Sequence, residues 1–358
     1  MTIAVVVATA AAGAQTVTPS PTKPPTPSPT PTPATTQQLV DTLGQADLQA
    51  AISFIKSNFT SPAALNDDEL NRALLQGLLV RYPQGLVLLG GAAPASAEPP
   101  APFYSEVFDG RIGYLRMGAL NSANLKALDQ KLQELGPKKI DALIVDLRQK
   151  DAGSDFAMAA EFAKRFCPKG KLLFTLRKPA ARQERQFNSD REPAMRALLT
   201  VLVDGDTSGA AEAMAAAFRV YNKGLIIGQP TAGRAVEYAD TALPGGKVLR
   251  VATAQTVGPN GDPLFPGGIK PDLDVAMSAA EKRQIFQASA EKGMAQFVYE
   301  TERPHLNEAA LIAGTNPELD NVVADRRNRG REKQPAVRDP VLQRALDVLT
   351  SLEIYEKR

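Results

Sequence analysis

The chain has 358 residues, of which 44% are hydrophobic and 22% charged, as is typical of a soluble globular protein with room for about two domains. Its 41 basic and 39 acidic residues almost cancel, so we expect no nucleic-acid partner held by phosphate neutralisation. One Cys (Cys167) and one His (His305) exclude an intramolecular disulfide and a zinc cage of His and Cys ligands. We expect no metal and no cofactor, and a His-based catalytic triad would have His305 alone as its base.

The N-terminal sequence indicates export. Residues 1–14 are apolar and end in Ala12-Gly13-Ala14, a pattern typical of a secretory signal peptide, so we expect a periplasmic or other extracytoplasmic protein. Residues 15–36 consist mainly of Pro and Thr and predict an extended tether. Such a tether favours association with the cell envelope or wall, with a spacer that has no such role as the alternative.

The remaining chain divides into four regions. Residues 37–91 have helical apolar spacing, with Asn66–Glu69 as a helix start, and a Pro-rich linker follows at 92–102. Residues 103–277 alternate between strands and helices, which predicts an α/β core with a parallel sheet. Residues 278–358 are expected to be helical. The strands expected in the core lie at 111–117, 142–147, 171–176, 198–203 and 225–227, the helices at 122–135, 156–166 and 210–220, and a hairpin arm at 247–257 with its turn at 259–262.

Five segments of this core, in order, resemble motifs of one known family. They are Ile112-Gly-Tyr-Leu-Arg116, Leu143-Ile-Val-Asp-Leu-Arg148, Val201-Leu-Val-Asp204 with Thr207-Ser-Gly-Ala-Ala-Glu212, Leu225 to Arg234, and Gly268-Ile-Lys-Pro-Asp272. The chain is similar here to the catalytic domain of the C-terminal processing, or tail-specific, serine proteases. The resemblance implies a crotonase-like α/β core, flanked in this chain by helical N- and C-terminal regions. The peptide-binding PDZ module of that family has no counterpart, because only the linker stands at its place.

The resemblance also implies a Ser–Lys dyad, in which a lysine made neutral by burial takes the proton of the serine hydroxyl. Aligned on Thr207 and Glu212, the serine position holds Gly209, and the lysine position holds Arg234. Glycine has no nucleophile, and the guanidinium of arginine is not deprotonated in proteins. The sequence therefore predicts a pseudoprotease of the serine peptidase family with a degenerate dyad, which binds a peptide or protein tail or acts as a scaffold.

Six residues form the predicted substrate-binding set: Ala152, Gly153, Thr207, Ser208, Gly209 and Arg234. Ala152 and Gly153 stand where the family has an oxyanion-region Gly pair. One alternative is an active serine-type peptidase that uses Ser208, with Lys223, Lys247, Glu237 or an unlocated group as base; the structural interpretation of Ser208 is a helix N-cap or turn hydroxyl. A second alternative is a crotonase-fold assembly protein. The basic cluster at 326–333 indicates either an anionic partner or a solvated linker.

Overall fold

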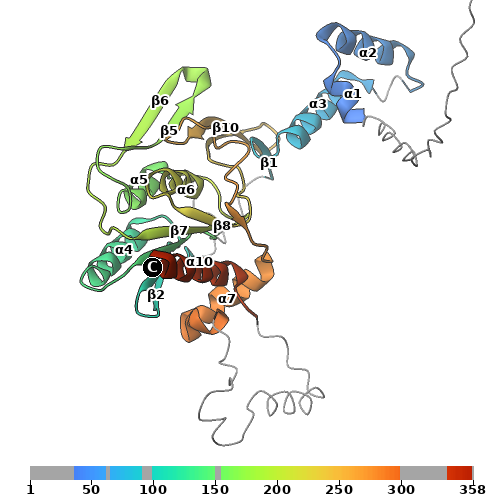
Figure 1. Cartoon of the computed structure of the whole chain (residues 1–358). Helices are drawn as coiled ribbons and strands as arrows, with labels where there is room; N and C mark the ends of the chain where they lie inside the picture. Colours follow the sequence, from blue (N-terminus) through green and yellow to red (C-terminus); the bar gives the residue numbers. More distant parts are fainter. Residues whose placement is uncertain (1–35, 62–64, 91–98, 150–154, 299–336, 357–358) are drawn as a thin grey trace, which may run out of the picture. The chain divides into compact units, whose positions relative to one another are not determined.

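The computed structural model describes residues 36–61, 65–90, 99–149, 155–298 and 337–356 (Figure 1). The expected signal peptide, nearly all of the tether, most of the linker, Ala152, Gly153, His305 and the cluster at 326–333 lie outside the described residues. The chain divides into two compact units, residues 1–72 and 73–358. The first unit contains α1 (Thr36–Asp41), α2 (Gln45–Asn58) and the start of α3 (Asp67–Arg81).

In the described part of the N-terminal region, the last of the three helices ends at Arg81. The side chain of Asn66 accepts the N–H of Glu69 at 2.9 Å, as the expected helix start requires. The helical region was expected to continue to residue 91, but Leu86–Leu89 form strand β1 instead. This run of four apolar residues pairs antiparallel with a strand more than 150 residues later, so a distant partner decides its conformation.

The central sheet of the second unit has six strands in the order β11-β8-β7-β4-β3-β2. All neighbouring pairs are parallel except β2 with β3, so the expected parallel core is confirmed. The strands are β2 (Tyr104–Phe108), β3 (Ile112–Arg116), β4 (Ala142–Asp146), β7 (Leu198–Val203), β8 (Leu225–Gly228) and β11 (Leu273–Asp274). β2 and β11 were not expected.

Helices cover both faces of this sheet (Figure 1). Alternate side chains of a strand point to opposite faces, so Leu115 and Val145 pack with one group of helices, and Tyr114 and Ile144 with the other. The first group is α4 (Ser122–Leu135), α5 (Phe156–Ala163) and α6 (Ala210–Tyr221), and the second is α7 (Ala279–Lys292) and α10 (Pro340–Glu356). The C-terminal helices therefore complete the second hydrophobic core.

A second sheet contains β1, β5 (Leu172–Lys178), β6 (Gln183–Asn188), β9 (Val236–Ala242) and β10 (Val248–Val257). The expected hairpin arm differs from the structure: β10 pairs with β9 across the turn before Val248, whereas the turn at 259–262 closes only an isolated bridge between Val257 and Pro263. None of the described helices is long and apolar enough to cross a membrane.

Candidate functional site

The turn between β7 and α6 holds the residues expected to carry the chemistry. Thr207 is fully buried, and its hydroxyl donates to the carbonyl of Leu147 at 2.9 Å, just beyond β4. The same oxygen accepts the N–H of Asp204 at 3.0 Å. Thr207 therefore fixes the turn against the end of the neighbouring strand, a role that its predicted place in a substrate-binding set did not include.

Gly209 is the N-cap of α6, and its backbone has φ 59° and ψ −124°. Residues with a Cβ rarely adopt this conformation, whereas glycine adopts it freely. Sharp strand-to-helix turns of this kind present the nucleophile in α/β hydrolases. Position 209 has such a turn but carries no side chain.

A buried carboxylate joins this turn to the segment between β8 and β9. Oε2 of Glu212 accepts the N–H of Gly209 at 3.0 Å and the N–H of Arg234 at 2.8 Å. Oε1 accepts the hydroxyl of Thr231 at 2.5 Å and the N–H of Gly233 at 2.7 Å. Burial raises the pKa of Glu212 above its ordinary 4.5, although all four hydrogen bonds act in the opposite direction.

The segment from β8 to β9 is held closely against its neighbours. The N–H of Ala232 donates to the carbonyl of Thr207 at 3.0 Å. Gly233 has φ 65°, and a Cβ there would lie 2.0 Å from the carbonyl oxygen of Pro266, so only glycine fits. This packing fixes the backbone of Arg234 beside the turn while its side chain is exposed. Within the described ranges, no carboxylate pairs with the Arg234 guanidinium.

Ser208 lies between Thr207 and Gly209 and is half-buried. The helix begins at Ala210 with Gly209 as N-cap, so Ser208 does not occupy the N-cap position, and its carbonyl accepts the N–H of Ala211 at 3.2 Å. Lys223 follows the other end of α6, about 18 Å away at 1.5 Å per helical residue, too far to serve as its base. Glu237 pairs with two cations, Lys178 at 3.2 Å and Arg185 at 2.5 Å.

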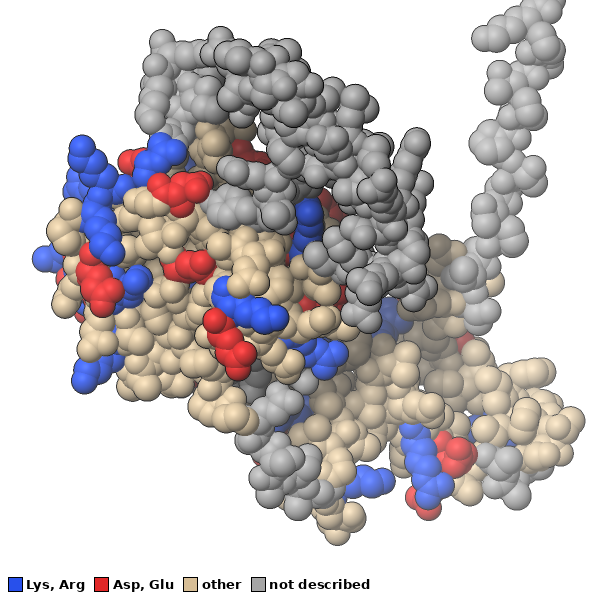
Figure 2. Space-filling view, turned by 90° about the horizontal axis from the view of Figure 1, so that it is seen from below, with Lys and Arg blue, Asp and Glu red and all other residues tan. Residues whose placement is uncertain are grey.

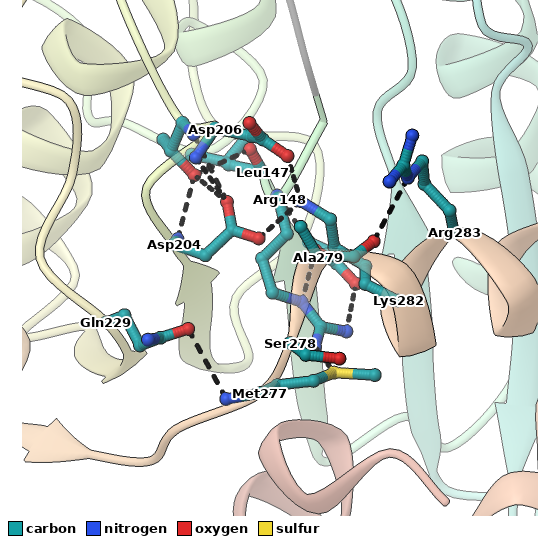
Figure 3. Close-up of polar contacts among 12 residues, drawn as sticks. Leu147, Arg148, Asp204, Asp206, Gln229, Met277, Ser278, Ala279, Lys282 and Arg283 are labelled. Carbon is teal, nitrogen blue, oxygen red and sulfur yellow. Dashed lines mark hydrogen bonds and ion pairs between the residues drawn. The ribbon is translucent and has the colours of Figure 1, made fainter. Parts of the chain in front are cut away.

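The structure adds an ionic clamp that the sequence analysis missed (Figure 3). Lys282 of α7 has a side chain only 5% exposed, and its Nζ donates to Asp204 at 2.5 Å and to Asp206 at 2.7 Å. Both carboxylates belong to the turn that leads to Gly209. The clamp joins residues more than 75 positions apart, and no local sequence pattern marks such a pair.

A buried ionic network lies at the end of β4. Arg148 binds Asp146 through Nε at 3.0 Å and through a second nitrogen at 2.7 Å, and it binds both oxygens of Asp339 at 3.0 and 2.8 Å. The hydroxyl of Tyr114 donates to Asp146 at 2.7 Å. Asp339 in turn accepts the N–H groups of Val341 and Leu342 at the start of α10. The Asp-Leu-Arg motif thus anchors the C-terminal helix.

Burial alone would raise the pKa of Asp146, but the charge of Arg148 and hydrogen bonds from Arg148 and Tyr114 hold it below its ordinary 3.8. Burial also raises the pKa of Tyr114 well above 10.0, with the charge of Asp146 adding to the effect. Cys167 is buried as well, and desolvation raises its pKa to about 12, so its thiol is unreactive at neutral pH.

Comparisons with known proteins find similarity over the α/β core. Residues 111–275, slightly less than half of the chain, match the model of Peptidase family S41. That segment is therefore similar to the peptidases of this family, and it contains the parallel α/β core of the structure. The helices before residue 111 and after residue 275 lie outside the matched segment.

Individual relatives are similar over the same part of the chain. The chain is 26% identical over 176 residues to carboxyl-terminal-processing peptidase 2, chloroplastic, of Arabidopsis thaliana, covering 49% of this chain and 34% of that protein. It is 26% identical over 175 residues to the carboxy-terminal processing protease CtpA of Bacillus subtilis, covering 49% and 37%. The chain thus spans a little over a third of the length of the curated relatives it matches.

Solved structures give weaker likenesses. The photosystem II D1 C-terminal processing protease has a TM-score of 0.41 and 23% identity, covering 53% of this chain and 47% of that one. A putative peptidase from Parabacteroides merdae has a TM-score of 0.49 and 16% identity, covering 66% and 84%.

Proposed function

We propose that this chain is an exported pseudoprotease, an S41-type protein that binds polypeptide and has no peptidase chemistry. The observation that carries the proposal is the arrangement around Glu212. One carboxylate holds the backbones of Gly209 and Arg234 side by side, so the two segments that would carry a dyad are assembled, while neither side chain fits the chemistry.

Both dyad positions, 209 and 234, lack the side chain that the chemistry requires. Loss of a serine nucleophile alone costs on the order of 10⁶-fold in rate. Arginine keeps its proton at every accessible pH, so Arg234 cannot act as general base. An intact backbone with two unsuitable side chains supports binding without turnover.

Arg234 suggests how a peptide would be held. Its guanidinium is exposed and unpaired within the described ranges, and its backbone lies next to the Gly209 turn. A guanidinium offers two parallel N–H donors to a carboxylate, which suits the free C-terminus of a protein tail. We propose that the ligand of Arg234 is the C-terminal carboxylate of a polypeptide.

The first experiment measures proteolysis by the full chain. Denatured casein and a mixed peptide pool are digested and the products identified by mass spectrometry, with Ser208→Ala as control. The proposal expects no cleavage above that control. Cleavage that disappears with Ser208→Ala would establish the alternative, an active serine-type peptidase with a nucleophile displaced by one residue.

The second experiment measures binding. Fluorescence anisotropy compares peptides with a free C-terminal carboxylate against the same peptides amidated, using the parent chain and Arg234→Ala. We expect the free-carboxylate peptides to bind at least tenfold more tightly, and Arg234→Ala to abolish that preference. Equal binding of both peptide forms would remove Arg234 from the proposed site.

Export and the role of the tether are tested by separate experiments. The proposal expects the mature protein to begin near Gln15 and to fractionate outside the cytoplasm. N-terminal sequencing of the protein from its native host measures the first residue, and cell fractionation with immunoblotting measures the compartment. A tether that holds the protein at the envelope would keep it with the wall or membrane fraction, and a variant lacking residues 16–35 would be released.

A further inference from the structure

The hairpin of β5 and β6 forms one end of the second sheet (Figure 1). β6 pairs with β5 only, and within the described residues no strand lies along its other edge. All residues of β6 are exposed except Phe187, which is half-buried. The outer edge of β6 therefore offers backbone N–H and C=O groups to a further strand.

The hairpin has a strong charge bias. Residues 172–188 contain the cations Arg177, Lys178, Arg182 and Arg185 and a single carboxylate, Glu184. On the face shown in Figure 2, by contrast, Lys and Arg lie interspersed with Asp and Glu. We call these four cations and the outer edge of β6 the basic edge.

Few anions neutralise the basic edge. Arg177 pairs with Glu184 at 2.6 Å, so one cation is matched within the hairpin. Lys178 and Arg185 share the carboxylate of Glu237 from β9, which leaves one positive charge in excess. Arg182 has no ion-pair partner in the described part of the chain.

The edge is also held in place. The ring of Phe187 lies 4.8 Å from that of Phe174, which is fully buried, and the guanidinium of Arg185 lies 5.0 Å from the Phe187 ring. The hairpin is thus anchored in the core of its sheet, and a binding strand would meet a preformed edge.

The charge bias decides which strand the edge accepts. Charged edge strands resist pairing with other edges, and a second copy of this hairpin would bring its own cations close to Arg182 and Arg185. An extended segment rich in Asp and Glu would instead place carboxylates against these cations, which is an attractive arrangement. Backbone hydrogen bonds supply affinity in such strand addition, and side-chain charges supply selection.

We propose that the basic edge binds an acidic polypeptide segment as an added strand, so that the excess cations pair with its carboxylates. Within the described residues, the ion pairs of these cations are with Glu184 and Glu237, and none is with Gly209 or Arg234. The proposal therefore stands or falls independently of pseudoprotease activity.

The test uses the full chain and a fluorescent ten-residue peptide of alternating Glu and Val, acetylated and amidated so that it has no free terminal carboxylate. A Lys-Val peptide of the same length is the comparison. We expect the acidic peptide to bind at least tenfold more tightly at low salt, with affinity that falls as NaCl rises. Amides within residues 183–188 should gain protection from hydrogen exchange when it binds.

The double variant Arg182→Glu/Arg185→Glu should weaken binding of the acidic peptide at least tenfold. The matched control is Lys138→Glu/Lys139→Glu, which changes two exposed cations just after α4 by the same total charge and should leave the binding unchanged. Equal binding of the two peptides, absence of protection in β6, or equal losses in both variants would overturn the proposal. Arg234→Ala should leave this binding intact.

Discussion

Oε2 of Glu212 accepts the backbone N–H of Arg234 at 2.8 Å, and the same oxygen accepts the N–H of Gly209 at 3.0 Å. A single carboxylate oxygen thus joins the start of α6 to the start of the β9 segment. Because Glu212 is fully buried, this junction lies out of contact with water. Glu212 binds positions 209 and 234 through their backbone N–H groups, so neither side chain takes part in this junction.

Replacement of Glu212 by Gln should therefore destabilise the protein. The amide offers one acceptor oxygen where the carboxylate offers two, so the N–H groups of Gly209 and Arg234 would face an NH₂ group. An unsatisfied buried donor costs about 1–3 kcal/mol, so we expect a loss of roughly 3 kcal/mol in the free energy of unfolding. Urea denaturation measures it, with the exposed Glu134→Gln as control; a loss equal to the control would contradict the role assigned to Glu212.

Arg148→Met should release the C-terminal helix. It leaves the carboxylates of Asp146 and Asp339 buried without their cation, and breaking a buried pair in this way costs about 3–5 kcal/mol. Hydrogen exchange in α10 should accelerate more than in α4, because Asp339 both binds Arg148 and caps α10.

A second variant separates charge from shape. Asp146→Asn/Arg148→Met/Asp339→Asn removes all three charges and keeps a residue that can cap α10. We expect it to recover part of the stability lost by Arg148→Met. No recovery would mean that hydrogen-bond geometry, and not the uncompensated charge, causes the loss.

The same network predicts the direction of acid unfolding. The pKa of Asp146 is lowered in the folded protein, so the folded state resists protonation more than the unfolded chain does. The stability that Asp146 contributes is thus fully present above its ordinary pKa of 3.8 and is lost as the pH falls through its lower folded value. Urea midpoints between pH 7 and pH 2 measure this, and the triple variant should show a shallower acid decline. Equal declines in stability of the parent protein and the triple variant would show that groups outside this network cause the acid sensitivity.

Some of this structure could be predicted from the sequence because it is local. The expected bounds of α4 and β7 match the structure, since each element has one clear period and its own boundary signals. β1 and β9 were missed because their conformation depends on pairing with β10. Among the candidate site residues, Gly209 and Arg234 were predicted from motif spacing, whereas the ion pair from Lys282 to Asp204 could not be, because it requires the fold itself.

Lys282, which belongs to α7, should stabilise the turn between β7 and α6 through its ion pairs. Asp204 and Asp206 are both partly shielded, with side chains 13% and 36% exposed, and Lys282→Met would leave them facing each other without a cation. We expect faster hydrogen exchange at residues 204–209 and a modest loss of stability, smaller than that of Arg148→Met because water reaches these carboxylates. Lys292→Met on the same helix is the control, and exchange rates unchanged relative to it would show that the clamp does not hold the turn.

Gly209→Ser tests whether the scaffold still accepts a nucleophile. At φ 59° and ψ −124° a side chain introduces backbone strain, which costs about 1–3 kcal/mol, and Gly209→Ala should cost a similar amount because the strain comes from Cβ. The single variant should not cleave peptides, since Arg234 cannot take the proton of the hydroxyl. Adding Arg234→Lys supplies an amine, but the side chain at position 234 is exposed, and without burial a lysine stays protonated at neutral pH. We therefore expect no casein cleavage by Gly209→Ser or by Gly209→Ser/Arg234→Lys; cleavage by the double variant would show that bound substrate buries residue 234, and cleavage by Gly209→Ser alone would show that a base other than residue 234 already serves this turn.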